Sequence, residues 1–111
     1  MSHTPAIEIN SPHYVYRIFD TEERLLYVGS ARDVGYRLFL HTSWSSQSPT
    51  SWEIRERMAR HTSQKFSTKL AAHAEEIRAI RKEAPLLNKQ HNPTRFRREN
   101  GIYVALQSVS T

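Results

Sequence analysis

Six separated side chains of this protein could together hydrolyse a phosphodiester bond. They are Tyr16, Tyr27, Arg37, His41, Glu76 and Asn88. Such a reaction needs a nucleophilic water, positive charge near the phosphoryl oxygens and help for the departing oxygen. Two phenols, a guanidinium, an imidazole, a carboxylate and an amide can meet these needs between them.

Arg37 and His41 are four positions apart, so a helix places both on one side, beside a stripe formed by Val34 and Leu38. The planar fork of donors on Arg37 suits a phosphate group, and His41 could bond a phosphate oxygen or orient Tyr16. Taken alone, Arg37 would be a solvated helix residue and His41 a polar residue near a helix end.

Glu76 is the predicted metal ligand. At 100° per residue it lies at the margin of an apolar helix face near Ile80, whereas Glu75 points towards solvent as a salt-bridged surface acid. One carboxylate together with waters and a substrate phosphate suits Mg²⁺ or Mn²⁺, so we expect one ion per active site. The other histidines lack the paired spacing of a zinc site, and His73 is predicted to pack on the apolar side of its helix.

The two tyrosines set a geometric requirement. Tyr16 and Tyr27 can reach one pocket only if they lie opposite or diagonal to each other on one face of a sheet, and a register slip of one residue would separate them. Gly29 would let a backbone or a substrate approach closely, although for Gly29 taken alone a turn is the better explanation. Asn88, three residues after Pro85, could position a phosphate or Glu76, or could be a turn asparagine.

The first half of the chain predicts a hairpin followed by a helix. Residues 14–19 and 25–28 are rich in β-forming residues and flank a polar stretch at 20–24. A helix is expected over 33–41, with Ser30 or Asp33 as its cap.

The second half predicts a loop over 42–50, a helix over 51–60 started by Ser51, and a strand over 61–66. A longer helix is expected from Ser67 or Thr68 to Glu83, ended by Pro85. One predicted apolar face of this helix consists of Leu70, Ala74, Ile77, Ile80 and Ala84.

Over residues 14–92 the order and spacing of these residues resemble the GIY-YIG nuclease domain. Tyr14-Val15-Tyr16 and Tyr27-Val28-Gly29 stand for its two named motifs, followed by Arg37, His41, Glu76 and Asn88. The resemblance implies a small α+β fold, a three-stranded mixed or antiparallel sheet flanked by helices, with its third strand between Arg57 and Phe66. Tyr14 departs from the pattern, since the first motif has Gly there, and it adds bulk beside Tyr16.

The resemblance also implies roles. Tyr16 would be the general base, which requires nearby positive charge because a free phenol has a pKa of about 10; Arg32 and Arg37 are candidate sources. Tyr27 would orient the water or touch the phosphate, Arg37 and His41 would clamp it, and Asn88 would support the site. Gly29 and Arg32 would contact substrate.

Composition points to a nucleic-acid partner. The 111 residues include 16 Lys and Arg against 11 acidic residues, a net charge of +5, which suits the phosphate backbone of DNA. Cysteine is absent, so disulfides and thiolate metal sites are excluded. No apolar run reaches membrane length and no secretory pattern is present, so we expect an intracellular, cytoplasmic protein without a membrane or small-molecule cofactor as partner.

The expected organisation is a flexible lead-in at 1–12, a nuclease-like domain at 13–92 and a basic tail at 93–111 with an extra strand or an oligomer contact. The tail arginines Arg95, Arg97 and Arg98 could contact DNA or be solvated charges.

The leading interpretation is a divalent-metal-dependent DNA endonuclease, which as a homodimer or by sequential nicking could break both strands. Relatives of this kind include repair nucleases, homing endonucleases and restriction enzymes. The alternatives are a non-catalytic nucleic-acid-binding module on the same fold, and an accessory protein whose apolar tail docks a larger partner.

Overall fold

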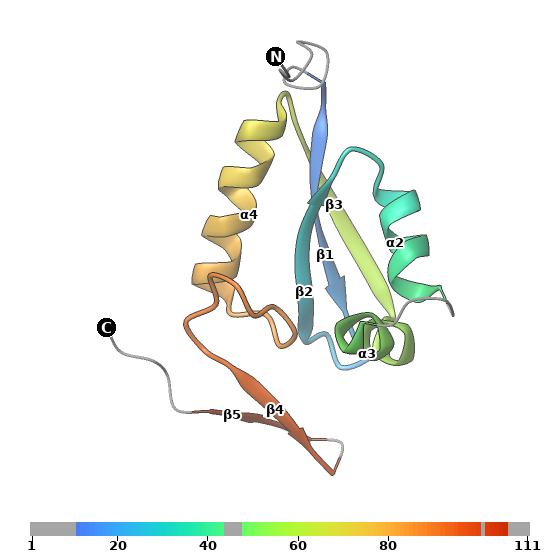
Figure 1. The fold of residues 1–111 in the computed structure, drawn as a ribbon, viewed down its shortest axis with the longest axis vertical. Helices are drawn as coiled ribbons and strands as arrows, with labels where there is room; N and C mark the ends of the chain where they lie inside the picture. The colour runs from blue at the N-terminus through green and yellow to red at the C-terminus, as the bar shows by residue number, and fades with distance from the viewer. Residues whose placement is uncertain (1–10, 44–47, 101, 107–111) are drawn as a thin grey trace, which may run out of the picture.

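The structure, a computed structural model, describes residues 11–43, 48–100 and 102–106. Two strands, two helices, a third strand and a longer helix follow one another along the chain and are followed by a short hairpin (Figure 1). Their bounds are β1 (His13–Phe19), β2 (Leu25–Ala31), α2 (Val34–Thr42), α3 (Pro49–Arg57), β3 (Arg60–Phe66), α4 (Lys69–Glu83), β4 (Phe96–Glu99) and β5 (Ile102–Ala105). The predicted α+β class is confirmed, and most of the predicted lead-in lies outside the described residues.

The three main strands form one antiparallel sheet in the order β2-β1-β3. The predicted hairpin is present, and Asp20 organises its turn: Oδ1 accepts hydrogen bonds from the backbone N–H groups of Glu22 and Arg24, both at 2.9 Å. The Arg24 guanidinium adds a bond to Oδ2 at 2.8 Å. Burial raises the pKa of the Asp20 carboxyl, but these hydrogen bonds outweigh it and the net pKa is lowered.

The sheet is covered on both faces. Figure 1 shows α4 along one side of the sheet and α2 with α3 along the other. Val15 and Val28 belong to a core cluster with Ala72, Ala79 and Ile80 of α4. A second cluster joins residues of β1 and β2 to both other helices; its buried members are Tyr16, Ile18, Leu26, Leu38 and Ile54. Each face of the central strand β1 therefore packs against a different part of the chain.

The predicted apolar face of α4 is partly wrong. Leu70 is 75% exposed and Ala74 is exposed, while the buried residues of the helix are Ala72, Ala79 and Ile80. Ala72, Ala79 and Ile80 follow the same helical period as the predicted stripe, so periodicity alone could not choose between the two faces. Small side chains at positions 72 and 79 let the helix lie close against the sheet.

Two other boundaries differ from the prediction. Helix α3 begins at Pro49 with Ser48, not Ser51, as its cap, and Pro at the first helical turn costs no hydrogen bond. Helix α3 also ends three residues early, at Arg57, because β3 starts at Arg60. Of the predicted loop at 42–50, residues 44–47 lie outside the described part of the chain.

The C-terminal segment forms a separate two-stranded sheet, β4-β5, rather than one added strand. The hydroxyl of Tyr103 donates to Glu53 of α3 at 2.9 Å, and Arg98 pairs with Glu53 and Glu56. Arg97 pairs with Glu99 within β4. Two of the three tail arginines are therefore held in ion pairs. Over the described residues, none of the helices has the length and apolar character needed to cross a membrane.

Candidate active site at the edge of the sheet

The register of the first hairpin brings the two tyrosines together. Tyr16 pairs with Gly29 and Ile18 pairs with Tyr27, so Tyr16 and Tyr27 are diagonal neighbours on one face of the sheet. Their ring centroids are 6.2 Å apart, and Tyr16 is only 1% exposed. The geometric requirement derived from the sequence is met.

Gly29 makes room for the Tyr16 ring. A Cβ atom at position 29 would lie 2.5 Å from both Cζ and the hydroxyl oxygen of Tyr16, closer than unbonded atoms can approach. Gly29 is buried within β2 and is not part of a turn. The close approach that the sequence assigned to backbone or substrate is therefore made by the phenol of the neighbouring strand.

Helix α2 places His41 next to Tyr16 and Tyr27. Asp33 caps the helix by accepting the backbone N–H of Tyr36 at 3.0 Å, and His41 occupies the last turn. Its Nε2 lies 2.9 Å from the Tyr16 hydroxyl, and its ring meets the Tyr27 ring edge-on at a centroid distance of 5.1 Å. Ser51 Oγ of α3 lies 3.5 Å from Nδ1, so both ring nitrogens have a partner.

Burial controls the protonation of this cluster. It raises the pKa of Tyr16, as does nearby Tyr27, while the Arg37 guanidinium lowers it by a smaller amount. Burial likewise raises the pKa of Tyr27, with a further contribution from Glu76. Burial and then Arg37 lower the pKa of His41 below its usual 6.5. At neutral pH both phenols are protonated and the imidazole is uncharged, so the tautomer of His41 sets which of Tyr16 and His41 donates in their hydrogen bond. The positive charge expected beside Tyr16 is present as Arg37, but burial dominates.

Glu76 approaches from α4. Its side chain is 20% exposed, and its Oε1 accepts a hydrogen bond from Ser30 Oγ at 2.8 Å and lies 3.3 Å from His73 Nδ1. Ser30 follows Gly29 in β2 and therefore projects from the face opposite to Tyr16 and Tyr27. The Glu76 carboxylate and the two tyrosine rings therefore lie on opposite faces of the sheet and come together at the edge strand β2.

The neighbours of Glu76 on α4 correct two predictions. The predicted ion pairing of Glu75 is present, with Arg78 and Arg17, but its side chain does not point into solvent, because it is only 18% exposed. His73 does not pack on the apolar side, since its side chain is 60% exposed and faces Glu76. The contacts of Ser30 and His73 with Glu76 were not predicted. The i, i+3 spacing on α4 pointed to the His73 contact, whereas the Ser30 contact joins residues 46 positions apart.

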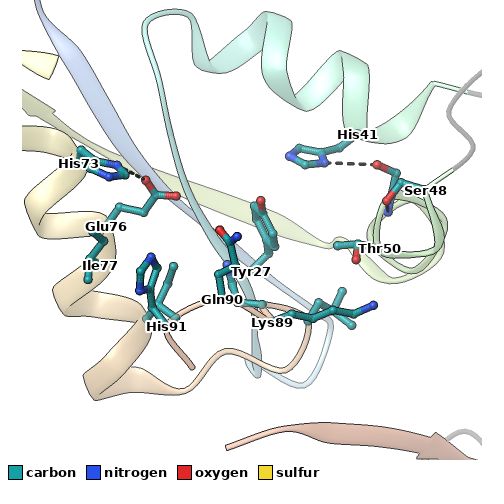
Figure 2. A pocket seen from close by; sticks show the side chains of 14 residues that line it. Tyr27, His41, Ser48, Thr50, His73, Glu76, Ile77, Lys89, Gln90 and His91 are labelled. Carbon is teal, nitrogen blue, oxygen red and sulfur yellow. Dashed lines mark hydrogen bonds and ion pairs between the residues drawn. The ribbon is translucent and has the colours of Figure 1, made fainter. Parts of the chain in front are cut away.

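A cleft of about 320 Å³ is lined by Tyr27, His41, His73 and Glu76, whereas Tyr16 is not among its lining residues. Figure 2 shows Tyr27, His41 and Glu76 pointing into it from different elements. Thr50 and Ser51 of α3 line one side, and the opposite wall follows the chain after α4, with Lys89, Gln90 and His91. Sequence reasoning did not select these last five residues, because none of them carries a recognisable motif.

Asn88 holds the edge strand. Its side-chain oxygen accepts the backbone N–H of Val28 at 2.9 Å, and its side-chain amide donates to the Val28 carbonyl at 2.9 Å. Both ends of the amide are used in this way, so Asn88 supports β2 next to Tyr27 rather than positioning Glu76. Asn92 in turn donates to the Asn88 carbonyl at 3.0 Å and to the Pro85 carbonyl at 2.7 Å.

Arg32 and Arg37 lie on the rim of the site. Both are exposed, Arg32 in the turn between β2 and α2 and Arg37 on the second turn of α2. Arg37 is near enough to the Tyr16 hydroxyl to affect its pKa. The structure therefore brings Tyr16, Tyr27, Arg37 and His41 together, whereas Arg32 lines a neighbouring groove with Arg37.

The donor set around Glu76 fits a hard divalent ion held mainly by water. No group of three or more carboxylate and imidazole side chains that could enclose a metal occurs within residues 11–43, 48–100 and 102–106. Glu76 offers one carboxylate at the wall of a polar cleft, with Ser30 fixing Oε1. Mg²⁺ keeps several waters and accepts such single-carboxylate attachment.

Comparison with protein families gives one match. The model of the GIY-YIG catalytic domain matches residues 12–96, which include every residue of the site described above. A comparison with curated proteins found none that matches the chain.

Proposed function

The chain belongs to the GIY-YIG catalytic domain family, and from that premise we propose that it is a divalent-metal-dependent endonuclease that hydrolyses phosphodiester bonds of DNA. The observation that carries this proposal is the convergence of Tyr16, Tyr27 and His41 with Glu76 on the two sides of the β2 edge. Two neighbouring phenols, one buried and one partly buried, next to an uncharged imidazole and a lone carboxylate suit attack of water on a phosphate better than they suit static binding.

In the proposed reaction Tyr16 acts as the general base. In this reaction His41 carries its proton on Nδ1, so the Tyr16 hydroxyl donates to Nε2 and an oxygen lone pair remains free to accept a hydrogen bond from the attacking water. As the water attacks, Tyr16 takes its proton and passes its own proton to His41. This relay avoids a free phenolate, which the burial of Tyr16 opposes. Tyr27, whose ring contacts His41, orients the water or the phosphate from the adjacent position.

Arg37 would bind the phosphoryl group with its planar fork of donors. Glu76 would hold the metal through a carboxylate oxygen while Ser30 keeps the side chain in place. One Mg²⁺ or Mn²⁺ ion bound there would supply positive charge to the phosphoryl oxygens and lower the pKa of a bound water. Asn88 keeps Val28 and the adjacent Tyr27 in register.

DNA is the proposed partner because the chain carries a net charge of +5 and exposes Arg32 and Arg37 at the site. A single site cuts one strand at a time, so double-strand cleavage would require a homodimer or two successive nicks. No small-molecule cofactor enters the proposed mechanism.

The test is incubation of the purified protein with supercoiled plasmid in Mg²⁺, in Mn²⁺ and in EDTA, beside Glu76→Ala and Tyr16→Phe. We expect metal-dependent nicking that both substitutions abolish while circular dichroism stays unchanged. Nicking that persists in EDTA or in Glu76→Ala would contradict the assignment. If the wild-type protein left plasmid, branched DNA and RNA uncut, the endonuclease proposal as a whole would be contradicted.

Two observations favour a second candidate, a nucleic-acid-binding module without cleavage. Burial raises the pKa of Tyr16, so little of the phenolate would form near neutral pH. Tyr14 projects from the same face of β1 two residues away and would narrow the pocket. Binding that weakens with salt, without metal-dependent nicking, would favour this candidate.

A further inference from the structure

Helix α2 exposes two aromatic rings next to the active site. Tyr36 is 57% exposed and Phe39 is 63% exposed, although Leu38 between them is buried against the sheet. The two rings are 6.5 Å apart with an angle of 26° between their planes, so they form a nearly parallel pair facing solvent. A monomeric protein gains nothing in stability from exposing this aromatic surface, which indicates a contact with another molecule.

A second groove runs beside the Tyr36 ring. Its volume is about 350 Å³, and it lies where the end of β2, the start of α2 and the start of α4 meet. Five of its lining side chains are basic or can be protonated: His13, Arg32, Arg37, Lys69 and His73. Among the described residues that line it, Asp33 is the one acidic residue, and its carboxylate already caps α2. The groove is therefore suited to a polyanion.

This groove continues into the active-site cleft. His73 lines both the groove and the cleft and contacts Glu76. Ser30 lines the groove and donates to Glu76 Oε1, and Arg37 lines the groove while acting on the Tyr16 hydroxyl. A strand with its scissile phosphate at Glu76 would extend directly into the groove.

We propose that this groove and the Tyr36–Phe39 pair bind a single-stranded segment of DNA adjacent to the bond that is cut. Arg32 and Lys69 hold a phosphate of that segment, and the exposed rings stack on one of its bases. This contact rests on the proposed function for its place in the reaction, but the binding itself does not require cleavage.

Base accessibility decides between single-stranded and duplex DNA. Within a duplex both faces of a base are covered by its neighbours, so an aromatic ring at the surface of the protein can stack only on an unstacked base. Basic side chains can bind the phosphates of either duplex or single-stranded DNA, whereas an exposed pair of aromatic rings favours single-stranded DNA. The preferred substrate would therefore carry a single-stranded region, as a flap, a gap or a free strand does.

The test is fluorescence anisotropy with a labelled twelve-nucleotide single strand of thymidines and a labelled twelve-base-pair blunt duplex, both in EDTA. The variants are Tyr36→Ala and Phe39→Ala, and the matched control is Ile102→Ala, which removes a side chain 64% exposed on β5 of the other sheet. We expect each aromatic substitution to weaken single-strand binding about five- to a hundredfold, to leave duplex binding within about twofold, and to leave circular dichroism unchanged. Arg32→Ala and Lys69→Ala should each lower the salt dependence of single-strand binding by roughly one phosphate contact.

Several results would overturn this inference. If Tyr36→Ala and Phe39→Ala weaken single-strand binding no more than Ile102→Ala does, or weaken duplex and single-strand binding equally, the rings do not stack on a base. Sedimentation velocity that shows a wild-type dimer dissociated by Phe39→Ala would assign the rings to a second copy of the chain. If plasmid nicking depends on Glu76 but Tyr36→Ala and Phe39→Ala leave single-strand binding unchanged, the nuclease proposal stands and the single-strand proposal is refuted. If the two aromatic substitutions weaken single-strand binding but the wild-type protein does not nick plasmid, the single-strand contact stands and the nuclease proposal is refuted.

Discussion

The Tyr16 hydroxyl lies 2.9 Å from Nε2 of His41, which is 25 positions further along the chain. Tyr16 stands on the central strand and His41 in the last turn of α2, so their contact depends on how that helix packs on the sheet. The Tyr27 ring contacts both. This three-ring cluster is the part of the site that burial keeps uncharged at neutral pH.

The hydrogen bond predicts that His41 assists Tyr16. His41→Ala should lower the plasmid nicking rate by about 10²- to 10⁴-fold, the usual range for loss of a group that moves a proton. His41→Gln, whose side-chain oxygen can still accept from the phenol, should recover part of that loss. Rates measured at saturating Mn²⁺ would check this, and equal rates for the two variants would show that acceptance of the Tyr16 proton does not matter.

Two adjacent glutamates provide a matched pair for the metal. Glu76→Gln should abolish binding of Mn²⁺, measured by electron paramagnetic resonance, together with cleavage. Glu75→Gln should keep both, because Glu75 is engaged with Arg78 and Arg17. Loss of Mn²⁺ binding in Glu75→Gln but not in Glu76→Gln would contradict the assignment of the ligand.

Gly29→Ala should damage the site through packing. The new methyl would lie 2.5 Å from the Tyr16 ring and hydroxyl, so either the phenol or the strand must move. We expect a loss of about 1–3 kcal/mol in the free energy of unfolding and a large loss of nicking. Gly35→Ala is the control: its Cβ would meet Asp33 Oδ1 at 3.6 Å, an ordinary contact, and Ala within α2 should stabilise the protein by about 0.5–1 kcal/mol. Urea denaturation of both variants measures the contrast.

Asn88→Asp tests whether the side-chain amide of Asn88 stabilises the edge strand β2. The substituted side chain can still accept the Val28 N–H, but a carboxylate oxygen would face the Val28 carbonyl in place of the donor. We expect destabilisation of about 1–3 kcal/mol and faster hydrogen exchange at Val28 than in the wild type. Unchanged exchange there would show that β2 does not depend on this amide.

The lowered pKa of His41 predicts a pH effect on stability. A group whose pKa is lower in the folded than in the unfolded state contributes stability that is present above its unfolded pKa, here about 6.5, and that is lost as the pH falls through the folded pKa. The free energy of unfolding should therefore decrease from pH 7.5 to pH 5.5 in the wild type, and the decrease should be smaller in His41→Gln. An NMR titration that gives His41 a pKa above 6.5 would contradict this sign.

The hairpin and the first helix could be predicted from the sequence because their signals are local. A polar turn between two β-rich runs, and Asp33 before an amphipathic segment, involve residues a few positions apart. The alternation of the strands then placed Tyr16, Tyr27 and Gly29 on one face once the register was known. The angular position of Glu76 on its helix favoured it over Glu75 as the metal ligand, and that assignment stays a prediction.

The sequence by itself determined which side chains are present, their elements and the family pattern that they follow. Only the tertiary structure decided that Glu76 meets Ser30 across 46 positions and that Asn88 holds Val28 across 60. It also decided which apolar stripe of α4 is buried, that Gly29 accommodates a phenol, and that the tail forms its own sheet docked on Glu53. The physical reason is range: turns, caps and periodicity depend on neighbours along the chain, whereas these contacts depend on which surfaces fit together when the whole chain packs.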